Sequence, residues 1–162
     1  MPQTSVSTAP SVAFAGMLAD AANTEDVDSY VSEEASAEMP FGAMVCQGAS
    51  DDTCKIFGAN TDKMLGIVQH SHAYQIANEL GTVGLKPKVT IGVKKRGKIW
   101  VTVDEAVTPT SAVRVRNDAN GGANTNGTFR TTASAGHTMN ISSFARFLST
   151  TTGAGVALLE YD

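Results

Sequence analysis

Short runs in which apolar and polar residues alternate dominate the chain after about residue 40. In residues 88–94 every second position is Val or Ile, and the same holds for residues 98–104. A period of two is typical of β-strands that bury one face. The turn Lys95-Arg96-Gly97 separates the two runs, so the pattern predicts that they pair as a β-hairpin.

Similar runs recur along the rest of the chain. Further strands are predicted at 41–48, 64–71, 112–116, 128–131, 145–149 and 156–161. Around Val27 and Val31 the alternation of the two faces favours another strand over a helix. Because no long amphipathic helix and no internal repeat accompany these runs, the sequence predicts an all-β fold, a small β-sandwich or barrel of jelly-roll type.

Charge is divided unevenly along the 162 residues. Residues 1–38 contain seven acidic side chains and no Lys or Arg, whereas residues 39–162 contain all twelve basic side chains. The first 20 or so residues are rich in Ser, Thr, Ala and Pro and show no sustained period. We therefore expect an extended, acidic N-terminal arm over residues 1–38 and a β-sandwich or barrel body over residues 39–162.

The supply of large apolar residues is small for a chain of this length. Leu, Ile, Val and Phe together account for 34 of the 162 residues. A thin core is sufficient when neighbouring subunits share the burial of apolar surface. We therefore expect a homodimer or homotrimer.

The cysteine content and the apolar segments argue against a disulfide-rich, an exported and a membrane-spanning protein. Cys46 and Cys54 are the two cysteines of the chain, and two cysteines do not make a disulfide framework. We expect two reduced, partly buried thiols, with a bridge across paired strands as the alternative. The apolar run at 12–19 has no basic residue before it, which argues against a signal peptide, and no segment approaches the ~18 apolar residues of a membrane helix.

The three histidines are the strongest candidates for a metal-binding site. His70 and His72 would project from one face of a strand, and His137 could supply a third ligand. The arrangement is similar to the metal-binding jelly rolls of the cupin type. However, Glu79 lies too far beyond His72, and no Pro-x-Gly turn precedes His137.

Other catalytic signatures are missing from the sequence. It has no nucleophile elbow, no phosphate-binding glycine loop and no dinucleotide fingerprint. We expect no enzyme activity, no cofactor, no metal and no small-molecule substrate, and keep a metal-dependent jelly-roll enzyme as an alternative.

Basic residues cluster around the predicted hairpin turn, beside Trp100. Such a patch could bind nucleic acid, but the net charge of −4 and the position at a turn favour contact with an acidic protein surface, such as residues 20–38 of a neighbouring copy. Both arginines of the strand 112–116 are expected to project outward, and Trp100 fits either a core or an interface position. The candidate protein-contact residues are Lys94, Lys95, Arg96, Lys98, Trp100, Arg114, Arg116, Glu33 and Glu34.

Four sequence motifs occur in a characteristic order. They are FGAMVCQG (41–48), LGIV (65–68), VKKRGKIWV (93–101) and the ending from ARFL to GVALL (145–159). Together they resemble the structural cement, or capsid decoration, proteins of tailed bacteriophages. The resemblance covers most of residues 40–162 and does not extend to the arm.

The resemblance implies a non-enzymatic protein that binds the outer surface of a phage capsid and bridges neighbouring major-capsid subunits. Its partners would be the major capsid protein and further copies of itself, with no nucleic acid and no membrane. It would be made in the cytoplasm of the bacterial host and reside on the virion. A phage tail component or a host-surface adhesion module is the alternative, because these also use small β domains in multiples.

Overall fold

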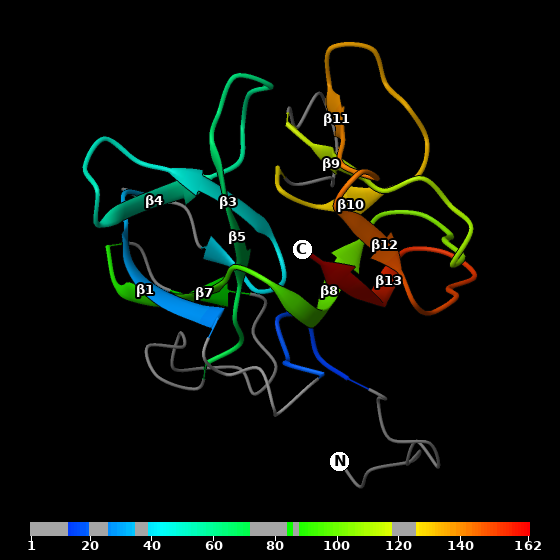
Figure 1. Ribbon diagram of the computed structural model, residues 1–162, viewed down its shortest axis with the longest axis horizontal. Coiled ribbons are helices and arrows are strands. Elements are labelled where there is room, and N and C mark those ends of the chain that lie inside the picture. Colours follow the sequence, from blue (N-terminus) through cyan, green and yellow to red (C-terminus); the bar gives the residue numbers. More distant parts are fainter. Residues whose placement is uncertain (1–12, 20–25, 35–38, 72–83, 86–87, 118–125) are drawn as a thin grey trace, which may run out of the picture.

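A closed barrel and an open sheet lie side by side in the computed structural model (Figure 1). The structure describes residues 13–19, 26–34, 39–71, 84–85, 88–117 and 126–162. The barrel, in the order β1-β4-β3-β5-β7, consists of β1 (Val27–Ser32), β3 (Met44–Gln47), β4 (Thr53–Ile56), β5 (Met64–Val68) and β7 (Thr90–Lys94). These described residues contain no α-helix, so the prediction of an all-β fold is confirmed.

The second sheet has six strands in the order β11-β9-β10-β8-β13-β12. They are β8 (Gly97–Val103), β9 (Arg114–Arg116), β10 (Phe129–Arg130), β11 (Thr138–Asn140), β12 (Ala145–Phe147) and β13 (Gly155–Tyr161). The longest pairing joins β8 and β13, from Gly97 opposite Tyr161 to Val103 opposite Gly155. A short pair, β2 (Met39–Pro40) with β6 (Gly84–Leu85), completes the set.

Two hydrophobic cores follow from this arrangement. One core fills the barrel and contains Tyr30, Met39, Phe41, Val45, Cys54, Val68, Ile91 and Val93. The other lies between the outer face of the barrel and the six-stranded sheet, where Met44 and Ile67 meet side chains such as Phe129 and Leu159. Strand β3 is buried on both faces because its side chains alternate between the two cores.

The predicted hairpin between residues 88–94 and 98–104 is wrong, although both runs form strands. Strand β7 pairs with β1 and β5, and β8 pairs with β13 and β10. The connection at Lys95 and Arg96 therefore carries the chain from the barrel to the six-stranded sheet (Figure 1). Alternation identifies a strand from local sequence, but the neighbours of that strand depend on contacts far apart in the chain.

The other predicted strands are confirmed in place, with shorter bounds in most cases. Strands β3, β5, β9, β10, β12 and β13 lie in or overlap the expected segments, and β1 confirms the strand around Val27 and Val31. Strands β4 and β11 are additional, as are the two-residue strands β2 and β6. Strands β4 and β11 are four and three residues long, which is too short for a period of two to stand out in the sequence.

Described parts of the predicted arm lie against or within the body. Strand β1 is a barrel strand, parallel to β4 and antiparallel to β7. Residues 13–19 run along the start of β8: the amide of Gly16 donates to the carbonyl of Trp100 at 2.6 Å, and that of Trp100 to Met17 at 3.0 Å. Gly16 has φ of +76°, a conformation that glycine adopts without strain. Residues 1–12, 20–25 and 35–38 of the predicted arm lie outside the described residues.

The two cysteines are free and fully buried, on opposite faces of the barrel wall. Cys46 on β3 belongs to the core between barrel and sheet, and Cys54 on β4 belongs to the core inside the barrel. The prediction of reduced thiols is confirmed, but both are fully and not partly buried. Their placement excludes a bridge between them. Burial raises the pKa of each thiol to about 12.

Both thiols are therefore expected to be unreactive in the folded protein. At pH 8 a Cys with this pKa is almost entirely protonated, and the thiolate is the nucleophile. A chromogenic disulfide reagent should detect no thiol in native buffer and two thiols per chain in 6 M guanidinium chloride. Fast labelling of either cysteine without denaturant would show that the described burial is wrong.

Candidate protein-contact site

The basic turn between β7 and β8 is neutralised within the chain. Arg96 donates from Nε and Nη2 to the two carboxylate oxygens of Asp26 at 3.3 and 3.1 Å. The ammonium of Lys95 pairs with the carboxylate of Asp28 and lies 5.5 Å from the ring centre of Tyr30. The acidic partners thus come from the same chain, next to and within β1, and not from a neighbouring copy.

The remaining candidates near this turn have different environments. Lys94 is only 1% exposed, so the described fold leaves little of this candidate contact residue accessible to a partner. It lies at the end of β7 and is paired with Ile67 of β5, in the contact that closes the barrel. Lys98 and Trp100 are half-buried on β8, where residues 16–19 lie beside them. Trp100 therefore occupies neither a full core position nor an exposed one.

Glu33 and Glu34 fasten the chain after β1 to the β3–β4 hairpin. Oε1 of Glu33 accepts hydrogen bonds from the Thr53 hydroxyl and the Ala49 amide, both at 2.6 Å. Oε1 of Glu34 accepts from the amide of Ile56 at 3.1 Å. The hydrogen bond from Thr53 holds the pKa of Glu33 below its ordinary value. Both carboxylates are engaged within the fold.

Arg116 is buried, which corrects the expectation that it projects outward. Its side chain is 8% exposed, and Nη2 and Nε lie 3.0 and 3.1 Å from Oδ2 of Asp104, a carboxylate that is itself 9% exposed. Asp104 follows β8, and β10 separates β8 from β9 in the sheet. The long arginine side chain therefore spans the width of β10 to reach its partner, a contact that local alternation does not reveal.

Glu105 is the second acidic residue at this end of β8. Its Oε1 accepts hydrogen bonds from the amides of Thr131 and Thr132 at 2.6 and 2.5 Å. Its Oε2 accepts from Nη2 of Arg130 at 3.2 Å. Asp104, Glu105 and Arg130 are not among the candidates of the sequence analysis. The signal that could have found them is an acidic pair directly after one strand, combined with arginines on two others.

Acid is expected to weaken the fold through Glu105. Burial raises the pKa of this carboxyl, but the hydrogen bonds from Thr132, Thr131 and Arg130 outweigh it and leave the pKa below its ordinary value of 4.5. The stabilisation is thus present above that value and is lost as the pH falls through the lowered pKa. We expect the free energy of unfolding of Glu105→Gln to be about 1 kcal/mol lower than that of the unsubstituted protein at pH 7.

The same comparison at low pH provides the control. At pH 3 the difference between Glu105→Gln and the unsubstituted protein should shrink, because protonation removes the charge from Glu105 as well. Urea unfolding followed by circular dichroism at both pH values measures it. A difference that stays constant between pH 7 and pH 3 would contradict the assignment.

Arg114 is the exception among the arginines of this face. It lies on β9 directly opposite Arg130 of β10 and two residues from Arg116. Its Nε is buried and has no hydrogen-bond partner. Among the described residues none forms an ion pair or a side-chain hydrogen bond with it. Arg114 is therefore half-buried and charged, and the described ranges provide no carboxylate partner for it.

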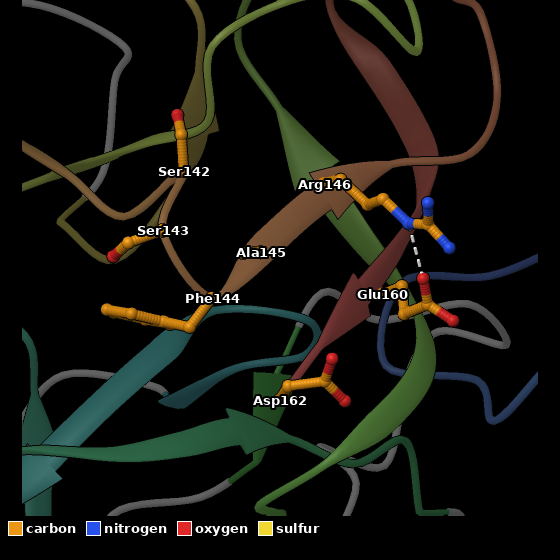
Figure 2. A pocket seen from close by; sticks show the side chains of 7 residues that line it. All are labelled: Ser142, Ser143, Phe144, Ala145, Arg146, Glu160 and Asp162. Carbon is orange, nitrogen blue, oxygen red and sulfur yellow. Dashed lines mark hydrogen bonds and ion pairs between the residues drawn. The ribbon is translucent and has the colours of Figure 1, made fainter.

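A shallow hollow of about 370 Å³ lies at the other edge of the same sheet. Ser142, Ser143, Phe144, Ala145, Arg146, Glu160 and Asp162 line it. Figure 2 shows Arg146 of β12 directed toward Glu160 of β13, where its Nε lies 2.5 Å from Oε2. The hydroxyl of Ser142 is hydrogen-bonded to the amide of Val113 and to Asn140. The hollow is thus an open, polar margin of an edge strand, in which Arg146 is paired with Glu160.

The histidines lie apart from one another in the described structure. His70 follows β5 and stacks against Phe41 with ring centres 4.4 Å apart, whereas His137 precedes β11 of the other sheet. His72 lies outside the described residues. Within the described ranges no three His, Cys, Asp or Glu side chains come close enough to hold a metal ion, and no helix is long and apolar enough to cross a membrane.

Comparison with known proteins decides the family. Over residues 1–162 the chain matches the model of a family described as structural cement protein (E217 gp24/Pam3 gp6). The chain belongs to this family. No curated protein sequence matches it. The resemblance in the four motifs is thereby confirmed, and it extends over the whole chain.

A solved structure shares the fold of this cement-family protein. It is a chain of a structure described as the capsid of Myoviridae phage XM1, which aligns with a TM-score of 0.67 at 20% identity, over 96% of this chain and 93% of that one. Structural cement proteins are phage structural proteins and not a class of enzyme. The cement-family chain therefore has a structural role in the virion, in association with capsid proteins.

Proposed function

We propose that this protein decorates the outer surface of the phage head and bridges neighbouring major-capsid subunits. The observation that carries the proposal is the match of all 162 residues to the structural cement family. The shared fold with a chain of the XM1 capsid structure supports it. In this reading the protein is made in the cytoplasm of the bacterial host and joins the assembled head.

The mechanism is thermodynamic linkage. A protein that binds the mature lattice, and not its dissociated subunits, stabilises the lattice by RT ln(1 + [L]/Kd), about 2.7 kcal/mol per site when its free concentration is a hundred times Kd. A head offers many equivalent sites, so modest affinity at each site is sufficient. Two sheets packed around two buried cores give a body stiff enough to hold neighbouring subunits at fixed positions.

The proposal includes a homodimer or homotrimer. Phe14 and Met17 support it, because they are 55% and 46% exposed on residues 13–19, which the backbone holds against β8. Exposed apolar side chains mark a protein contact when they belong to one contiguous apolar patch. Linking two or three lattice contacts in one oligomer raises the overall affinity without any strong single contact. Size-exclusion chromatography with light scattering measures the mass.

Stripping and re-addition tests the function. Heads from which this protein has been removed should lose resistance to heat or to chelators and regain it when the purified protein is added back. An unrelated β protein of similar size and charge is the control. Unchanged stability of stripped heads would contradict the proposal, and density on the tail in cryo-microscopy of whole virions would favour the tail alternative.

A further inference from the structure

We propose that Arg114 binds a carboxylate of the major capsid protein. The inference rests on the proposed function and names the chemistry of one contact. It concerns the face of the six-stranded sheet that carries Arg114, Arg116 and Arg130. Because β9 alternates, Arg114 and Arg116 share that face, and the register places Arg130 opposite Arg114.

Charges on this face do not balance. Asp104 pairs with Arg116 at 3.0 Å, and Glu105 pairs with Arg130 at 3.2 Å. Oδ1 of Asp104 also lies 3.7 Å from Nε of Arg130, which is an ion pair without a hydrogen bond. Asp104 is thus shared between Arg116 and Arg130, and Glu105 is paired with Arg130. Arg114 is left as a third guanidinium, and the described part of the chain supplies no acid for it.

Arg114 destabilises the free protein. A buried donor without an acceptor destabilises a fold, and like charges directly opposite on paired strands repel each other. Nε is the buried, unpartnered atom of Arg114. Its terminal nitrogens Nη1 and Nη2 are not in that state, and the residue as a whole is half-buried. A carboxylate that arrives from outside would bind these nitrogens and cancel the excess charge.

The chemistry favours one carboxylate over a polyanion. The planar guanidinium matches a carboxylate in a two-pronged contact. Asp104 and Glu105 lie on the same face and would repel the successive phosphates of a nucleic acid. A second copy of this chain is a poorer source of the acid, since most acids of the described part are already engaged: Asp26, Asp28, Glu33, Glu34, Asp62, Asp104, Glu105 and Glu160.

The test compares Arg114→Ala with a matched arginine. Arg146→Ala removes an exposed arginine from the opposite edge of the same sheet, where Glu160 is its partner. We expect Arg114→Ala to raise the Kd for stripped heads by roughly 10- to 100-fold, the effect of losing a hydrogen-bonded charge pair. Its melting temperature should equal or exceed that of the unsubstituted protein, whereas Arg146→Ala should leave the Kd within about twofold.

Two further variants keep the result interpretable. Arg114→Met preserves the packing of the aliphatic stem and should show the same loss of binding if Arg114→Ala folds poorly. Arg114→Lys keeps the charge but not the two-pronged geometry, so it should bind with intermediate affinity. Both measurements use the full chain and stripped heads.

Three outcomes would overturn the inference. Binding of Arg114→Ala and Arg114→Met to heads with unchanged Kd would show that the arginine makes no contact. A fall in oligomer mass in these variants would identify a second copy as the source of the carboxylate. Failure of the unsubstituted protein to bind heads would overturn the proposed function itself, so the two failures are distinguishable.

Discussion

Replacing Asp104 by Ala is expected to lower the free energy of unfolding by about 3–5 kcal/mol. The carboxylate is 9% exposed and accepts from Nη2 and Nε of Arg116, whose side chain is 8% exposed. Without it the guanidinium of Arg116 would remain buried with no compensating charge, and Arg130 would lose its second acidic neighbour. Urea unfolding of Asp104→Ala measures the loss.

Two controls separate charge from packing. Asp104→Leu combined with Arg116→Met replaces both ions by apolar groups, and should recover most of the loss because no uncompensated charge remains. Glu160→Ala breaks the pair with Arg146, whose side chain is 69% exposed, and should cost less than about 1 kcal/mol. If Asp104→Ala is no worse than Glu160→Ala, the buried pair does not stabilise the connection between β8 and β9.

Replacing Gly66 by Ala is expected to cost about 3 kcal/mol or more. A Cβ at this position would lie 2.2 Å from the carbonyl oxygen of Lys94 and 2.9 Å from its carbonyl carbon. Both neighbours are backbone atoms, so the methyl group can be accommodated only if β5 and β7 move apart. Their pairing, Ile67 with Lys94 and Val68 with Val93, closes the barrel.

Gly153→Ala is the matched control for Gly66→Ala. No heavy atom lies within 4 Å of a Cβ built at Gly153, and its φ is not positive. Its free energy of unfolding should stay within about 0.5 kcal/mol of the unsubstituted protein. Guanidinium unfolding monitored by the fluorescence of Trp100 compares the two variants. An equally small effect of Gly66→Ala would show that the barrel does not close where the structure places it.

Contact residues were harder to predict than strands. The alternation in residues 112–116 predicts the same outward position for Arg114 and Arg116, because both stand at its polar positions. The structure separates them: Arg116 is buried against Asp104, whereas no described residue forms an ion pair with Arg114. Composition counts charges, but only the fold shows which of them are already neutralised. For the same reason the basic turn at Lys95 and Arg96 is a weaker candidate for contact with another protein, because Asp28 and Asp26 neutralise its charges.

Local alternation of side chains and the order of four motifs determined the all-β class, most of the strands and the family. These are properties of neighbouring residues, and a period of two is visible in any window of six or seven positions. Only the tertiary structure decided that β7 closes a barrel with β1 and β5 while β8 joins β13, and that a strand from the acidic segment belongs to that barrel. Strand partners and ion pairs depend on which distant segments meet. The free energy that favours one pairing over another comes from contacts in both cores, so no single segment of the sequence determines it.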